Sequence, residues 1–183
     1  MNRAIEIAAA ALRDAGYALE EIDLPKLAEI PETYMRMIMT EFSLIRPILE
    51  RLLSAQSRRY IEFSIALSGP VDLAENIRLT SVRQGLLREW AQFLSHYPLI
   101  LGPVFTEPAV PVDFDIRGLD ELKRVGDALL LCTATSFVGV PAVALPTHVA
   151  GSLPQGVQVI ASFATSVFIR EPSDRTAECP RSI

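Results

Sequence analysis

The chain has 183 residues, of which half are hydrophobic, and it carries a formal net charge of −5. This length allows one domain or part of a larger one. The acidic balance and the absence of a dense Lys/Arg block argue against nucleic acid as a partner, because phosphate binding needs a basic face; Arg58-Arg59 is a pair expected on a solvated helix turn.

The cysteine content and the first residues bear on the compartment. Cys132 and Cys179 are too few for a disulfide framework and have no metal-ligand partners nearby in the sequence. Met1 to Glu6 do not form a basic segment followed by an apolar core, so no secretory signal is recognised. A reducing, cytoplasmic setting is therefore expected.

The N-terminal segment has the pattern of a helix followed by a strand. Apolar residues in 3–15 recur at helical spacing, which predicts a helix lying on a core, and Gly16 is placed to cap its end. Tyr17–Leu24 reads as a strand ended by Pro25. An α/β unit rarely begins with its helix, so the chain is expected to be the later part of something longer.

Two further helical stretches follow. Pro31 can open a helix at its first turn, and Tyr34–Leu53 continues in helical style, with Pro47 expected to kink or split it. Asp72, with Glu75 three residues later, resembles a capping box and starts the clearest helix in the chain. The apolar stripe of that helix is Val82, Leu86, Trp90, Phe93 and Tyr97.

The C-terminal half alternates strands and a helix. The predicted elements are a buried strand at Leu99–Phe105, a loop over Glu107–Gly118, a helix from Glu121 to about Thr135 with Asp120 as its cap, and strands at Ala142–Val149 and Gly156–Ala161. We therefore predict an α/β fold with a mixed sheet of about four strands flanked by helices.

One long segment, Ala128–Ile169, has no charged residue and is cut by Gly and Pro into strand-sized pieces. This pattern is typical of strands buried on both faces of a sheet. A membrane span is excluded, because it needs about 18 uninterrupted apolar residues. The chain is divided accordingly into a domain over 1–162 and a divergent tail over 163–183, which is expected to be disordered.

The residue types for hydrolysis are present, but they form no recognisable set. A nucleophile needs a neighbouring base, and no Gly-x-Ser-x-Gly elbow exists. Thr135 and Ser136 lie where a helix meets a strand, where hydroxyls often satisfy backbone groups, and Cys132 is expected to be a core thiol. A new hydrolase built from Ser136 and His148 remains the least supported alternative.

Metal and cofactor sites are not expected. Asp113, Asp115 and Asp120 lack the Gly and the distal Glu of a calcium loop and are interpreted as a solvated loop. No Gly-rich loop followed by Lys-Ser/Thr is present to hold a phosphate.

Three segments resemble the C-terminal portion of amidase-signature hydrolases. They are Tyr97–Pro103 (YPLILGP), Ser136–Pro146 (SFVGVPAVALP) and Leu153–Ile160 (LPQGVQVI). The opening segment, Ala9–Pro25, and the spacing of Arg83, Trp90 and Phe93 are also similar to the family, so the resemblance covers roughly residues 4–162.

The resemblance implies an α/β protein that hydrolyses amide bonds with a Ser nucleophile, a second Ser in a cis peptide and a Lys. Those residues lie in the N-terminal half of the family, and this chain has no Gly/Ser-rich signature or matching Lys, so no catalytic residue is carried over. In a complete enzyme, the segments 102–108 and 132–139 would lie near the substrate channel. The implied pocket-wall residues are Gly102, Pro103, Cys132 and Ser136.

Two hypotheses for the function result. The favoured one is a truncated amidase-like protein that is inactive alone. The alternative is an interaction module that binds either a missing N-terminal half or a second copy of itself through an uncovered sheet face. No cofactor, metal, nucleic acid or membrane is expected to bind.

Overall fold

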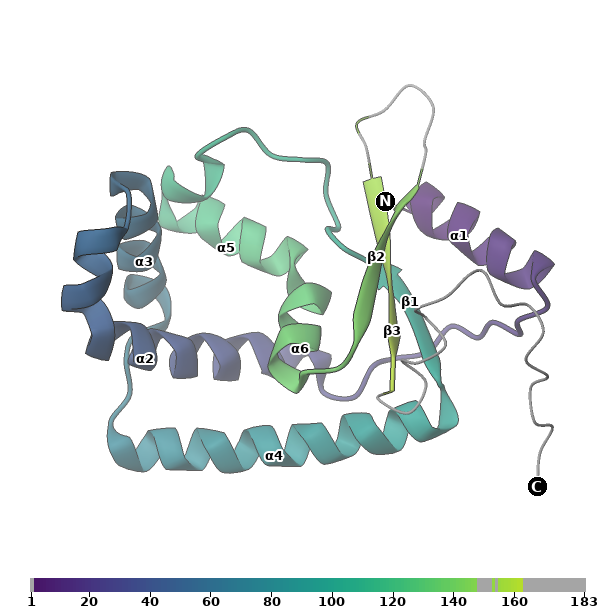
Figure 1. The fold of residues 1–183 in the computed structure, drawn as a ribbon, viewed down its shortest axis with the longest axis horizontal. Helices are drawn as coiled ribbons and strands as arrows, with labels where there is room; N and C mark the ends of the chain where they lie inside the picture. Colours follow the sequence, from purple (N-terminus) through teal and green to yellow (C-terminus); the bar gives the residue numbers. More distant parts are fainter. Residues whose placement is uncertain (1, 148–152, 154, 163–183) are drawn as a thin grey trace.

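Figure 1 shows the computed structural model, which describes residues 2–147, 153 and 155–162. In these residues, helices surround one small sheet. The elements in chain order are α1 (Asn2–Asp14), η1 (Leu27–Glu29), α2 (Ile30–Leu52), α3 (Ala55–Ser68), α4 (Leu73–His96), β1 (Leu99–Pro103), η2 (Phe114–Ile116), α5 (Leu119–Ala128), α6 (Leu130–Val138), β2 (Ala142–Thr147) and β3 (Gln155–Ala161). The predicted tail, 163–183, lies outside the described residues.

The sheet has the strand order β1-β3-β2 and is antiparallel throughout its described part. The α/β class and the flanking helices are therefore confirmed, whereas the prediction of a mixed sheet of about four strands is wrong for this part of the chain.

The expected strand at Tyr17–Leu24 has no regular secondary structure. Tyr17, Leu19, Ile22 and Leu24 are apolar, but no other described strand pairs with this segment.

Helices lie on both faces of the sheet. Figure 1 shows α1 on one side of the sheet and α6 on the other, with α4 running beneath α6 and the ends of the strands. Contacts between α1 and all three strands place it across one face. On the opposite face Ile100 and Ile160 join the main core cluster with residues of α4 and α6. The edge strand β2 is different, because four of its six residues are exposed.

The predicted stripe on α4 is largely buried. Leu86 and Trp90 are in the core, and Val82 and Phe93 pack against it. The Trp90 indole Nε1 donates a hydrogen bond to the Pro25 carbonyl over 3.0 Å. This bond holds the segment before η1 against α4 although the two residues are far apart in the sequence.

Most of the helix ends predicted from the sequence are present in the structure. Asp72 caps α4 by accepting a 2.8 Å hydrogen bond from the Glu75 amide, and Gly16 adopts the left-handed conformation (φ 91°) after α1. Pro47 lies inside α2 without splitting it. No described helix has both the length and the apolar character required to cross a bilayer.

The helix predicted over Glu121–Thr135 is two helices, with α5 ending at Ala128 and α6 beginning at Leu130. At the junction the Ala128 carbonyl accepts a hydrogen bond from the Thr106 amide over 3.1 Å. The cap of α5 is Gly118, not Asp120, which lies in the first turn. The loop before α5 therefore contacts that helix at its end as well as leading into its start.

Candidate functional site

The end of β1, the start of α6 and the centre of β3 meet at one buried side chain, Gln158. Its amide nitrogen donates a hydrogen bond to the Pro103 carbonyl over 2.8 Å and lies 3.4 Å from the Cys132 sulfur. The Cys132 thiol in turn donates to the Val104 carbonyl over 3.1 Å. Gln158 is 3% exposed, so these contacts are shielded from water. The structure thus brings Pro103 and Cys132 together.

Gly102 lies at the closest approach of β1 to α6. A Cβ atom added at this residue would overlap the side chain of Leu131. Leu131 is itself buried in the core cluster, so it has little room to move away. The glycine is therefore needed for packing.

Ser136 is separated from this cluster. It lies four residues after Cys132 on α6 and is exposed, whereas its neighbour Thr135 is buried and donates its hydroxyl to the Cys132 carbonyl over 2.9 Å. Gly102, Pro103 and Cys132 thus belong to one packed junction, and Ser136 faces solvent on the same helix.

The thiol of Cys132 is held in its neutral form. Burial raises its pKa, and the hydrogen bond from Gln158 opposes this rise only in part. Because the thiolate is the nucleophilic form, a half-buried thiol with a raised pKa is a weak nucleophile. Cys132 therefore acts as a small packing residue and a hydrogen-bond donor.

The chain contains two lysines, and both are in exposed ion pairs. Lys26 Nζ is 2.6 Å from a carboxylate oxygen of Glu89, and Lys123 Nζ is 2.7 Å from Asp127. The hydrogen bond and charge of Glu89 raise the pKa of Lys26. Neither lysine contacts a hydroxyl in these pairs.

The buried hydroxyls of the described residues are used by the helices that carry them. Each donates to a backbone carbonyl three or four residues earlier; these residues are Thr33, Thr40, Ser64 and Thr135. In the described ranges, every buried side-chain nitrogen or oxygen has a hydrogen-bond partner. His148, the partner considered for Ser136, lies outside the described residues, as does Cys179.

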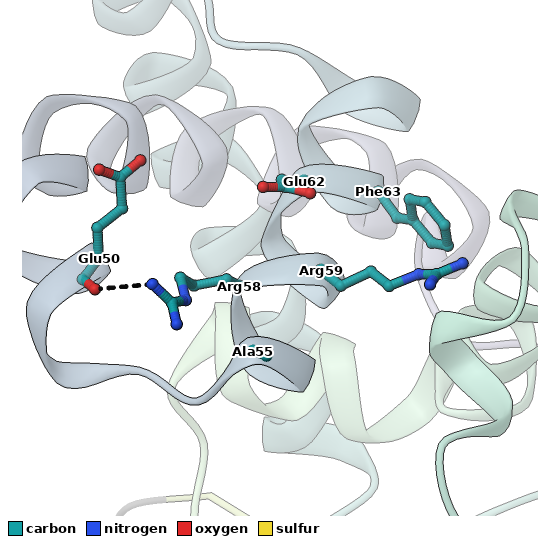
Figure 2. A pocket seen from close by; sticks show the side chains of 6 residues that line it. All are labelled: Glu50, Ala55, Arg58, Arg59, Glu62 and Phe63. Carbon is teal, nitrogen blue, oxygen red and sulfur yellow. Dashed lines mark hydrogen bonds between the residues drawn. The ribbon is translucent and has the colours of Figure 1, made fainter.

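The structure also shows a hollow away from this junction, on α2 and α3 (Figure 2). Charged residues line it, and they are satisfied locally: Arg58 donates to the Glu50 carbonyl over 3.2 Å, and Arg59 lies over the Phe63 ring at 5.1 Å. The hollow is open to solvent and holds no hydroxyl or thiol. Arg58 and Arg59 are both exposed, as predicted.

No group of three His, Cys, Asp or Glu side chains within the described residues could hold a metal ion.

Gln158, which links β1, α6 and β3 by its contacts, was not predicted from the sequence. The available signal was a single amide in the middle of an otherwise apolar strand, because a polar group buried there needs a partner.

Comparison with known proteins supports the resemblance. The family model described as Amidase matches residues 1–165. An indoleacetamide hydrolase of Bradyrhizobium japonicum is 24% identical over 163 residues, which cover 88% of this chain and 35% of that protein. One subunit of the glutamyl-tRNA(Gln) amidotransferase of Lactobacillus gasseri is 24% identical over 185 residues, covering 88% of this chain and 38% of that protein. The chain thus spans about a third of the length of these relatives.

Solved structures show the same fold. An amidase matches 88% of this chain and 38% of its own, with a TM-score of 0.67 and 22% identity. An allophanate hydrolase of Kluyveromyces lactis matches 88% of this chain and 26% of its own, with a TM-score of 0.66 and 20% identity. The family match spans every described element, and the chain belongs to the amidase family.

Proposed function

We propose that this chain supplies scaffold and one wall of the substrate channel of an amide-hydrolysing enzyme, and that it does not carry out the reaction alone. The observation that carries the proposal is the state of its two lysines, which are both in exposed ion pairs with carboxylates. A serine nucleophile needs a base within hydrogen-bond reach of its hydroxyl. A lysine whose charge is stabilised by a carboxylate is a poor proton acceptor.

The hydroxyls support the same proposal. Those buried in the described residues donate to helix carbonyls, so their protons are already engaged. Ser136 is exposed and has no described base beside it. Hydrolysis by attack on a carbonyl also requires donors aimed at the developing oxyanion, and none of the contacts among the described residues assigns a group to that role.

The wall is formed by the junction of β1 and α6. Gln158 fixes the Pro103 carbonyl and the Cys132 thiol, and thereby sets where the chain leaves β1 for the long loop before α5. Ser136, exposed on α6, offers a hydroxyl to a substrate next to this junction. These residues would shape a channel whose reacting groups come from other parts of an amidase.

The test is an assay of ammonia release by the purified chain from a panel of amides that includes indole-3-acetamide, the substrate class named for one relative. We expect no release above the buffer rate. A mock purification from cells that do not express the chain serves as the control for contaminating hydrolases. Release that exceeds this control would overturn the proposal.

A second candidate function is an interaction module, which is favoured by exposed apolar side chains. On α2, Leu44 and Leu52 are each 77% exposed, and the strand β2 is mostly exposed as well. Full burial of one such side chain is worth about 1.5–3 kcal/mol, so leaving several in water is costly. Among the described strands, β1 and β3 have no exposed residue, so the exposed sheet surface there lies on β2. The proposed partner is either the remainder of an amidase or a second copy.

A further inference from the structure

We propose that the free edge of β2 pairs, antiparallel, with β2 of a second copy of this chain. The two sheets would then form one continuous sheet across the dimer. This inference rests on the interaction module proposed above and is independent of the proposed role in an amidase. It follows from the direction in which the backbone groups of β2 point.

The hydrogen bonds to β3 determine those directions. The Ala161 amide donates to the Pro141 carbonyl over 3.0 Å, so Pro141 faces β3. Because successive residues of an antiparallel strand alternate in the direction of their backbone groups, Val143 and Leu145 also face β3. The residues whose backbone N–H and C=O groups point away from β3 are Ala142, Ala144 and Pro146.

Pro146 fits this assignment. Proline has no N–H to donate, so it is tolerated in a sheet where that position points away from the neighbouring strand. At Pro146 the missing donor costs no bond to β3. The free edge therefore offers two N–H donors, from Ala142 and Ala144, and three carbonyl acceptors, from Ala142, Ala144 and Pro146.

Within the described part of the chain, no strand other than β3 pairs with β2, and its outer edge carries no charged side chain. Natural edge strands are shielded by short length, charged side chains, proline, bulges or covering elements, and of these β2 has a length of six residues and the outward Pro146. The whole of β2 lies inside the charge-free segment 128–169, and four of its six residues are exposed. The helices α1 and α6 lie over the faces of the sheet, so they do not provide a pairing partner for the outer edge.

A second copy fits the edge in a symmetric register centred on Ala144. In this register Ala144 lies opposite Ala144 of the other copy, and each Ala142 amide points toward the Pro146 carbonyl of the other copy. Each Pro146 therefore acts only as an acceptor, which is all that it can do. The small alanine side chains allow the two strands to approach without a clash.

Symmetry favours this partner, and the local charge at the edge does not oppose it. Two copies with a formal net charge of −5 repel each other, and the repulsion is weakest where the contact surface carries no charge. When β2 pairs with β2, a two-fold axis relates the two copies and the assembly stops at a dimer. Pairing of β2 with β1 of another copy would leave one edge of each copy unpaired, so further copies could add and form a chain. The residues of β1 are also buried or half-buried, so this strand is less accessible.

The first test is the Ala144→Pro variant, compared with the wild type by sedimentation velocity over a range of concentrations. The substitution removes one outward N–H, as Pro146 already does, and leaves the bonds to β3 in place. We expect a dimer for the wild type and a monomer for the variant. A wild type that remains monomeric, or a variant that dimerises like the wild type, would overturn the proposal.

The matched control is Leu44→Glu, which places a charge in the other exposed apolar surface, on α2. We expect this variant to dimerise normally. Dissociation by Leu44→Glu together with dimerisation of Ala144→Pro would show association through α2 and contradict pairing at β2. The ammonia-release assay is unaffected by either result, so failure here is distinguishable from failure of the proposed role in an amidase.

Amide hydrogen exchange in the wild type gives a test that needs no variant. Pairing would protect the outward Ala142 and Ala144 amides, slowing their exchange at least about tenfold between dilute and concentrated protein. The Val143 and Leu145 amides, which face β3, are the internal reference and should be slow at both concentrations. Fast exchange of Ala144 in concentrated protein would overturn the proposal even if Ala144→Pro failed to fold.

Discussion

The side-chain amide of Gln158 lies 3.4 Å from the sulfur of Cys132 in the middle of an otherwise apolar junction. The same nitrogen donates to the Pro103 carbonyl over 2.8 Å, so one side chain joins β3 to both α6 and the end of β1. An amide buried in this way must be fully hydrogen bonded, because an unpaired polar group in the interior is costly. The junction therefore depends on the hydrogen bonds of Gln158 as well as on apolar packing.

Gln158→Leu should lower the free energy of unfolding by about 1–3 kcal/mol, the cost of leaving a buried acceptor without its donor. Urea denaturation monitored by circular dichroism measures the change. The control is Gln155→Leu in the same strand, whose side chain is half-buried and lies at the strand end. Equal effects of the two substitutions would contradict the role assigned to Gln158.

The raised pKa of Cys132 predicts a loss of stability in alkali. The folded state holds the thiol proton more tightly than the unfolded state, so the stabilisation is present below the ordinary thiol pKa of 9.0 and disappears as the pH rises through the higher folded value. Tyr60, whose pKa is raised mainly by burial, contributes with the same sign from its ordinary value of 10.0 upward.

Urea midpoints at pH 7, 9 and 10 test this prediction on the wild type and on Cys132→Ala. The variant should lose less stability than the wild type between pH 9 and pH 10, because the contribution of the Cys132 thiol has been removed. Parallel pH curves for the two proteins would show that Cys132 does not titrate differently on folding.

Much of the helical structure was predictable from the sequence, because its signals are local. Asp72 with Glu75, the glycine after α1 and the stripe containing Trp90 each depend on residues within a few turns of one another. These patterns report directly on the backbone and on one helix face.

Several of the failures involve distant partners. Tyr17–Leu24 has the apolar residues of a strand, but no other described strand pairs with it and it is irregular. The break between α5 and α6 coincides with the bond from the Thr106 amide to the Ala128 carbonyl. Gln158 was not recognised because its partner, Pro103, is 55 residues away in the sequence. Proximity of this kind is set by the fold and cannot be read from local periodicity.

Gly102→Ala should destabilise the protein by about 1–3 kcal/mol, the usual cost of forcing an extra carbon into a packed core. The added Cβ would overlap Leu131, which is buried between β1 and α6. The matched control is Gly126→Ala in α5, where nothing lies within 4 Å of the added atom. That substitution should stabilise the helix by about 0.5–1 kcal/mol.

A double variant, Gly102→Ala with Leu131→Ala, tests whether overlap with the Leu131 side chain causes the loss of stability in Gly102→Ala. If the clash with Leu131 is responsible, adding Gly102→Ala to a Leu131→Ala protein should cost much less than adding it to the wild type. Additive effects in thermal unfolding would contradict the packing explanation for this glycine.

Trp90→Phe should lower the free energy of unfolding by about 1–3 kcal/mol, since it removes the bond to the Pro25 carbonyl and part of a buried ring. Hydrogen exchange should show the loss mainly in the segment before η1 and in α4. Phe93→Leu, which removes ring area without a hydrogen bond, is the comparison. A loss spread evenly over the molecule in both variants would contradict the role of Trp90 as the anchor of that segment.

The most direct measurement of whether this chain contains an activated serine is labelling with a fluorophosphonate, read by intact mass. Such reagents modify a serine hydroxyl that a neighbouring base has made nucleophilic. With both lysines in ion pairs and the described buried hydroxyls bonded to helix carbonyls, the mass should be unchanged after prolonged incubation. Stoichiometric labelling that is abolished by Ser136→Ala, or that maps to any other single serine, would show a complete nucleophile and contradict a purely scaffolding role.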